Sequence, residues 1–217
     1  MPERAYQLWT ADQPDFNWLT RVKSGRGDSG MRPPYVTVLC RACNRFSLDD
    51  VFRLGFEPPH RIRVRKGRNL LVTEDYFLCV RDGILDALNA AGVKGFASKP
   101  LPQTEWHVLS VTDRRPFDAS AYEPEGRKCI ECGRQPQYRT IQFERQIDRP
   151  AERLTFFCTA TERGQGGFDT FVTEPLLEVL RGAGAKGATF QRLLDAEEEE
   201  RQAREPSWKP KGSVVVL

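Results

Sequence analysis

The chain has 217 residues, of which 39% are hydrophobic and 29% charged, and its 33 Lys and Arg nearly balance its 30 Asp and Glu, for a formal net charge of +3. A chain of this length can bury a hydrophobic core without depending on disulfides. So small a net charge does not by itself indicate a nucleic-acid partner.

The N-terminus lacks a basic start followed by an apolar run, and no segment approaches the roughly 20 apolar residues that span a bilayer. We therefore expect a cytoplasmic protein with no membrane partner. In that reducing compartment the six cysteines are expected to be thiols or metal ligands instead of disulfides.

Residues 1–34 are predicted to form an N-terminal arm that packs on the body of the protein. The segment is polar and rich in glycine between residues 24 and 30, which indicates a loop. Its apolar residues resemble docking points; they are Trp9, Phe16, Trp18 and Leu19.

Several strands are predicted after the arm. Residues 35–39 form an apolar, β-branched run that leads straight into Cys40-Arg41-Ala42-Cys43, which is typical of a strand that feeds a metal-binding turn. Residues 61–65 alternate between arginine and apolar side chains, as in a half-exposed strand. Residues 70–72 and 76–80 carry further strand-like residues.

A helix is predicted over residues 83–91, because its apolar side chains recur at helical spacing and Gly92 is a natural stop. The sequence of residues 85–95 recurs at residues 177–187, with six identities in eleven positions. This helical phrase repeats after 92 residues and the cysteine pair after 89. We infer two related halves joined near residues 116–125.

Two CxxC turns are the candidate metal-binding motifs of the sequence. Two thiolates separated by two residues can ligate the same tetrahedral ion, and two such turns complete a closed site with no open position for catalysis. The 85 residues between the pairs exceed the usual spacing, but halves packed about a pseudo-twofold axis would bring equivalent turns face to face. We predict one structural zinc ion at Cys40, Cys43, Cys129 and Cys132, with metal-free thiols and redox use as the alternatives.

The predicted fold class is α+β, with two related zinc-ribbon-like halves that share the zinc site through internal duplication. Each half contains a CxxC turn, antiparallel strands and one helix. The first half spans residues 35–115 and the second residues 116–195, and both form one compact unit. A charged C-terminal tail follows at residues 196–217. The charged stretch at residues 195–205 predicts a solvated helix end or disorder, and residues 214–217 predict a short edge strand.

No catalytic residue is predicted. Cys79 and Cys158 lie in apolar runs and are expected to pack in the core. His60 and His107 are expected to be ordinary surface or strand residues, and no nucleophile has an evident base beside it. Neither CxxC turn is followed by a clear helix, which disfavours a thioredoxin-like enzyme.

Basic side chains cluster between Arg61 and Arg68. Such a stripe on a zinc-ribbon protein can contact phosphates. No aromatic residue is interleaved with it to stack on bases, so a solvated strand face is favoured. A nucleic-acid-binding zinc-ribbon protein is therefore the alternative function.

The turns Cys40-Arg41-Ala42-Cys43-Asn44 and Cys129-Ile130-Glu131-Cys132-Gly133, together with the two helix-glycine phrases, resemble the myxobacterial double-CxxCG family. This family includes immunity proteins for swarm-inhibition toxins. The resemblance implies that the chain binds a cognate antibacterial toxin and neutralises it by occlusion, and it carries over only the four cysteines. The first turn departs from the family pattern because it ends in Asn44. Candidate toxin-binding anchors are the tryptophans: Trp9, Trp18, Trp106 and Trp208.

Overall fold

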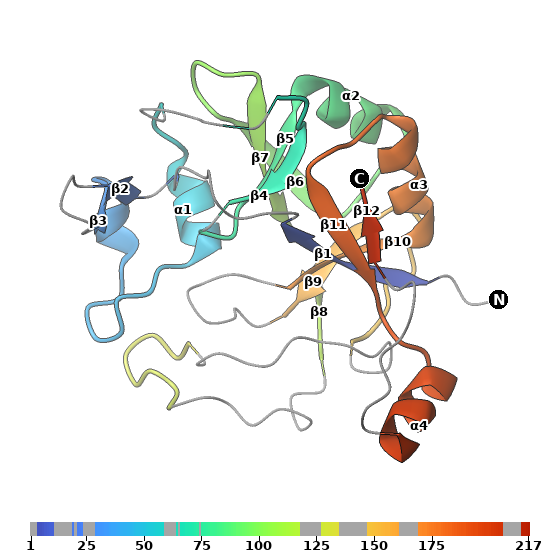
Figure 1. Ribbon diagram of the computed structural model, residues 1–217. Coiled ribbons are helices and arrows are strands. Elements are labelled where there is room, and N and C mark those ends of the chain that lie inside the picture. Colours follow the sequence, from blue (N-terminus) through green and yellow to red (C-terminus); the bar gives the residue numbers. More distant parts are fainter. Residues whose placement is uncertain are drawn as a thin grey trace.

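The computed structural model describes residues 4–10, 19, 21–23, 29–58, 64, 66–73, 75–117, 127–134, 147–160, 169–205 and 214–217. Within these residues the chain has a mixed α+β fold (Figure 1). Its helices are the 3₁₀-helix η1 (Tyr35–Val38) and the α-helices α1 (Leu48–Leu54), α2 (Asp82–Ala90), α3 (Glu174–Gly182) and α4 (Ala196–Arg204).

Three sheets accompany the helices in the described parts of the chain. The largest has six strands in the spatial order β12 (Val214–Val216), β11 (Ala188–Arg192), β1 (Ala5–Thr10), β10 (Thr170–Thr173), β9 (Phe156–Thr159) and β8 (Arg114–Arg115). The second has four strands in the order β4 (Leu70–Val72), β5 (Leu78–Arg81), β7 (Trp106–Val111) and β6 (Phe96–Pro100). The third is a hairpin of β2 (Arg21–Lys23) and β3 (Ser29–Met31).

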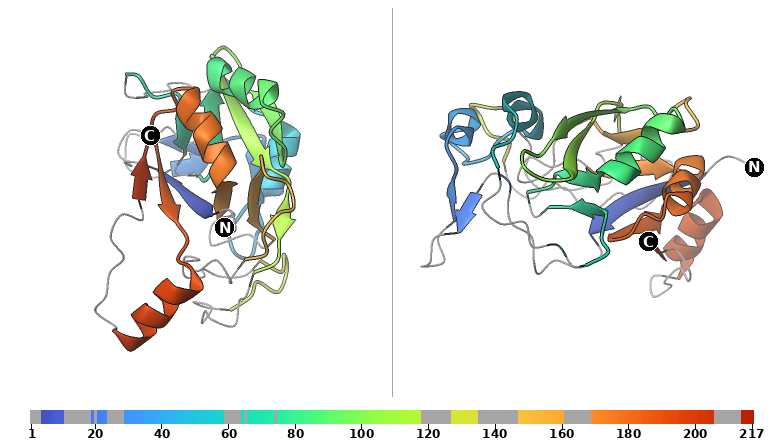
Figure 2. Two further views of the ribbon diagram at one scale, coloured as in Figure 1. Left: turned by 90° about the vertical axis from the view of Figure 1, so that its right-hand side faces the viewer. Right: turned by 90° about the horizontal axis from the view of Figure 1, so that it is seen from above.

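Both larger sheets and the helices α2 and α3 build one hydrophobic core. The two helices contact each other and lie side by side over the strands (Figures 1 and 2). Leu88 of α2 and Leu180 of α3 are fully buried in this core together with Phe156 and Phe190. A second buried cluster lies under α1 and η1 and includes Tyr35.

The predicted helix at residues 83–91 is confirmed as α2, and its repeat is α3. Each helix continues directly from a strand, β5 or β10, and each buries three apolar side chains on one face, at positions i, i+1 and i+4. The chain leaves each helix through a glycine in the left-handed region, because Gly92 and Gly184 both have φ of 68°. Glycine takes this conformation without a steric penalty.

The segments that follow the two helices hydrogen-bond across to each other's sheets. The backbone of Lys94 donates to the carbonyl of Leu154 at 2.9 Å and accepts from the amide of Phe156 at 3.1 Å. The carbonyl of Lys186 accepts from the amide of Leu70 at 3.1 Å. The two sheets are therefore tied together by main-chain hydrogen bonds at two corresponding places.

The strand predicted at residues 35–39 is wrong, because η1 occupies most of this segment. The backbone amide and the hydroxyl of Thr37 both donate to the carbonyl of Pro34, at 3.0 and 2.7 Å, and close a tight turn. Local hydrogen bonding thus overrides the β-propensity of the run. Leu39 makes only an isolated bridge to Phe46.

Other predicted elements have mixed outcomes. The strand at residues 70–72 is confirmed as β4, and residues 76–80 overlap β5. The edge strand predicted at the C-terminus is β12, which lies beside β11 at one end of the described strand order. Of the predicted strand at residues 61–65, all but Val64 lies outside the described residues. No helix in the parts of the chain that the structure describes is long and apolar enough to cross a membrane.

Gly95 is a position where only glycine fits. Its φ is 78°, and an added Cβ would lie 2.0 Å from the carbonyl oxygen of Phe156. We predict that Gly95→Ala lowers the free energy of unfolding by at least about 2 kcal/mol, since strain and a backbone clash combine. Urea denaturation would measure the change.

Gly83→Ala is the matched control, because Gly83 lies within α2 and an added Cβ there meets nothing within 4 Å. Alanine at this position should leave stability unchanged or raise it by up to about 1 kcal/mol through helix propensity. Equal effects of the two substitutions would contradict the close approach of the two sheets at Gly95.

Candidate metal centre

The four cysteines of the two CxxC turns meet at one point. Cys40 Sγ lies 3.8 Å from Cys129 Sγ, and Cys43 Sγ lies 3.6 Å from Cys132 Sγ. All four sulfurs lie within 4.8 Å of one another and are half-buried. The structure therefore brings together every residue that the sequence nominated as a ligand.

The spacing of the sulfurs suits a tetrahedral metal ion. Zinc–sulfur bonds of about 2.3 Å in a tetrahedron place neighbouring sulfurs about 3.8 Å apart, which agrees with the two contacts at 3.8 and 3.6 Å. The thiols are not paired as disulfides. Four thiolates would complete the coordination shell of one ion and leave no position for a substrate or water.

The two turns have the same hydrogen-bonding pattern. The amide of Cys40 donates to the carbonyl of Arg45 at 2.8 Å, and the amide of Cys129 donates to the carbonyl of Arg134 at 3.0 Å. In each turn the residue after the second cysteine donates back to the first cysteine's carbonyl at 2.9 Å. That residue has positive φ in both turns, 53° at Asn44 and 69° at Gly133, which are residue types that tolerate this region.

Arg134 connects the second turn to the first. Its Nη1 donates to the carbonyl of Arg45 at 3.1 Å, and its Nη2 lies 3.9 Å from Asp50 of α1. The N-cap of helix α1 is Ser47, whose hydroxyl accepts from the amide of Asp50. The cap fixes the start of α1 just beyond the first turn, so the helix, the two turns and the guanidinium form one connected unit.

The environment of the sulfurs differs between the turns. The backbone amides of Cys132 and Glu131 lower the pKa of Cys129 to about 6, because their N–H groups favour the thiolate. Burial, together with hydrogen bonds to the neighbouring thiols, raises the pKa of Cys43 to about 12. A bound cation would favour the thiolate form at both positions, since metal ligands must be deprotonated.

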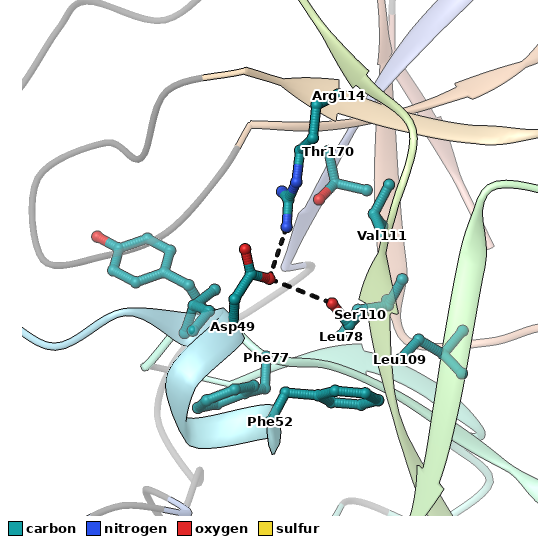
Figure 3. A pocket seen from close by; sticks show the side chains of 11 residues that line it. Asp49, Phe52, Phe77, Leu78, Leu109, Ser110, Val111, Arg114 and Thr170 are labelled. Carbon is teal, nitrogen blue, oxygen red and sulfur yellow. Dashed lines mark hydrogen bonds and ion pairs between the residues drawn. The ribbon is translucent and has the colours of Figure 1, made fainter. Parts of the chain in front are cut away.

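A small, mainly apolar pocket with a charged pair at one side lies between α1 and the end of β7 (Figure 3). Asp49 of α1 points into it and accepts from Arg114 Nη2 at 2.7 Å and from Ser110 Oγ at 3.4 Å. Phe52 and Tyr76 also line the pocket. The Asp49–Arg114 ion pair fastens α1 to the sheets.

Tyr76 is an exposed aromatic residue with an unusual backbone. Its side chain lines this pocket, the residue is 46% exposed, and its φ is 67°. A bulky residue rarely adopts positive φ unless its surroundings require it. Sequence reasoning missed Tyr76, and no local pattern signals a positive φ at a tyrosine.

The remaining residues singled out in the sequence lie away from the four sulfurs or outside the described part. Cys79 and Cys158 are buried, in agreement with the prediction, and Arg114 donates to Cys158 Sγ at 2.8 Å. His107 Nε2 lies 2.7 Å from Asp82 at the start of α2. Those outside the described residues are Phe16, Trp18, His60, Trp208 and, in the basic stripe, residues 61–63 and 65.

Trp106 does not serve as an exposed anchor, because it is 4% exposed and packs in the second core cluster. The guanidinium of Arg81 lies 5.2 Å from its ring centroid. The backbone of Trp9 belongs to β1.

Comparison with known protein families, with curated proteins and with solved structures found no match to this chain.

Arg134→Met is predicted to weaken metal binding by about tenfold or more, because the loss of a group that orients the ligand turns typically has that effect. Titration with Co²⁺, followed by thiolate absorbance and then displaced by Zn²⁺, would measure the affinity. Arg53→Met is the control: Arg53 pairs with the same Asp50 at 3.0 Å, but its side chain is 77% exposed. Equal affinities for both variants would contradict the supporting role of Arg134.

Proposed function

We propose that Cys40, Cys43, Cys129 and Cys132 bind one structural zinc ion that clamps the two turns together. The support is the donor set: four sulfurs at tetrahedral spacing, in two turns of matching hydrogen-bond pattern. Thiolate sulfur favours zinc among common cellular metals. A closed site gives the ion a structural and not a catalytic role.

The proposed fold comprises two related halves that arose by internal duplication. The second set of elements β10, α3 and β11 begins 92 residues after β5, α2 and β6, element by element. The first strands pair in a similar way, because Val80 pairs with Leu70, and Val172, 92 residues later, pairs with Phe156, although Phe156 lies only 86 residues after Leu70. Under this proposal the two cysteine turns are equivalent parts of zinc-ribbon-like halves.

The proposed function is that of a cytoplasmic immunity protein, not an enzyme, which binds a cognate antibacterial toxin and neutralises it by occlusion. The resemblance to the double-CxxCG family supports this, and its specific content is the pair of CxxC turns. The observation that carries the proposal is the cluster of four cysteine sulfurs, because an ion bound there would stiffen a binding scaffold and offer no reactive position. A rigid surface loses less conformational entropy when it binds a partner.

Tyr76 is the proposed toxin-binding anchor in place of Trp106. It is an exposed aromatic residue held in a constrained backbone, and it lines a pocket that also presents Phe52 and the Asp49–Arg114 pair. Aromatic side chains beside charged groups are typical of residues that dominate binding free energy at interfaces.

A second candidate is a nucleic-acid-binding zinc-ribbon protein. The observation that favours it is that Arg41, Arg127 and Lys128, in or just before the cysteine turns, are exposed. Exposed cations next to a metal centre can contact phosphates. Binding of this kind would weaken steeply as salt is raised.

We predict that the purified chain contains one zinc ion, and that Cys43→Ser and Cys132→Ser each abolish stoichiometric binding. Elemental analysis with thiol counting would measure this. Cys79→Ala should keep the zinc, because Cys79 is buried in the core away from the turns. Zinc-free protein with four freely titrating thiols in the turns would contradict the proposed site.

Co-expression with the toxin encoded beside the gene is predicted to rescue growth and to yield a stable complex. Tyr76→Gly should reduce the affinity for the toxin by at least about tenfold, as loss of an aromatic anchor does. It should leave the melting temperature nearly unchanged, since glycine accepts the positive φ. Isothermal calorimetry and thermal unfolding would measure the two effects.

Leu54→Ala is the control for Tyr76→Gly, because Leu54 is also an exposed apolar residue, 49% exposed, at the end of α1. Failure of both rescue and complex formation would end the immunity proposal. A salt-dependent shift of DNA or RNA at submicromolar protein would instead favour the nucleic-acid candidate.

A further inference from the structure

The two larger sheets contain the same arrangement of four strands, but one strand of the second arrangement comes from a different part of the chain. The smaller sheet has the order β4-β5-β7-β6, and the larger sheet contains the order β9-β10-β1-β11. All neighbours within each set of four are antiparallel. The place taken by β7 in the first set is taken by the N-terminal strand β1 in the second.

The registers of β1 and β7 are the same. His107 of β7 pairs with Val80 on one side and Pro100 on the other. Tyr6 of β1 pairs with Val172 and Arg192, which lie 92 residues after those partners. Tyr6 therefore occupies the position of His107. A slip of one residue would reverse the faces of the whole strand, so this agreement is a strong constraint.

The main-chain hydrogen bonds at the start of the two strands also correspond. Asp82, at the start of α2, donates to the carbonyl of Glu105 just before β7 at 3.0 Å. Glu174, at the start of α3, donates to the carbonyl of Arg4 just before β1, also at 3.0 Å. Each strand is thus hydrogen-bonded to the beginning of the helix in its own set.

A second pair of main-chain hydrogen bonds also occupies corresponding positions at β7 and β1. The amide of Leu101 donates to the carbonyl of Trp106, the first residue of β7, at 2.7 Å. The amide of Leu193 donates to the carbonyl of Ala5, the first residue of β1, at 3.0 Å.

Side chains of β7 and β1 also make corresponding contacts. His107 Nε2 lies 2.7 Å from Asp82 Oδ1, and the hydroxyl of Tyr6 donates to Glu174 Oε1 at 3.4 Å. Two residues further along, Leu109 and Leu8 are both buried in the shared core. Strand β1 thus reproduces main-chain register, a polar contact to the helix and an apolar contact to the core.

We propose that the space between β10 and β11 is a strand-accepting site. In this chain the site is filled by β1 (Ala5–Thr10), which lies outside the second half in sequence. In the first set the chain turns directly from β6 into β7, whereas after β11 it continues to α4. The second set therefore lacks a following strand of its own at this place. The partner that fits is an extended segment, antiparallel to both neighbours, with the sequence of β1.

The proposal uses the correspondence between the halves and does not depend on zinc or on a toxin. Its test starts from the full-length folded chain, with a protease site inserted between Ala11 and Asp12. After cleavage, residues 1–11 are held only by non-covalent contacts. Size exclusion with mass spectrometry then reports retention of the segment, and a fluorescent peptide of residues 1–11 reports entry of a replacement.

The cleaved segment should co-elute with the rest of the chain, and the labelled peptide should replace it, at the latest as the sample is warmed toward its unfolding midpoint. The same peptide with Leu8→Asp should bind at least about tenfold more weakly, because it places a charge in the core. Prompt loss of the segment without a fall in the unfolding midpoint would overturn the proposal. Failure of the labelled peptide to enter at any temperature, or equal binding of both peptides, would also overturn it.

Discussion

The convergence of four cysteine sulfurs from turns 89 residues apart is the constraint on which the account of this protein depends. A metal ion bound there would close a long loop, and its binding free energy would contribute directly to the stability of the folded chain. The ion would also fix α1, because Arg134 of the second turn contacts both the carbonyl of Arg45 and the carboxylate of Asp50. The pocket that contains Asp49 is built on the same helix, so the proposed binding surface depends on the clamp.

The rest of the molecule is held by a core that does not need the metal. Helices α2 and α3 pack side by side over both larger sheets, and the segments after them exchange hydrogen bonds with each other's first strands at Leu70 and Phe156. Close approach at these points explains glycine at position 95, where a Cβ would collide with the neighbouring carbonyl. The protein therefore combines a large apolar core with one local cluster of four cysteines. Loss of an ion bound there would loosen the α1 side more than the sheets.

Sequence reasoning succeeded where local signals and tertiary structure agree. The helical phrase at residues 85–95 located α2, and its repeat located α3, because apolar spacing and a glycine stop act within one segment. It failed at residues 35–39, where Thr37 and Pro34 close a turn. It also missed α1, although Ser47 followed by two aspartates is a start signal that was available.

The sequence analysis placed β1 in an N-terminal arm and did not predict it as a strand. The reason differs from that for residues 35–39. Residues Ala5 to Leu8 are all buried, so the strand lacks the alternation that identifies a half-exposed strand, and its partners lie more than 160 residues away in β10 and β11.

The most direct measurement of the central claim is X-ray absorption at the zinc edge of the purified chain. The account predicts four sulfur ligands at about 2.3 Å, whereas a shell with nitrogen or oxygen ligands, or with fewer than four sulfurs, would contradict it.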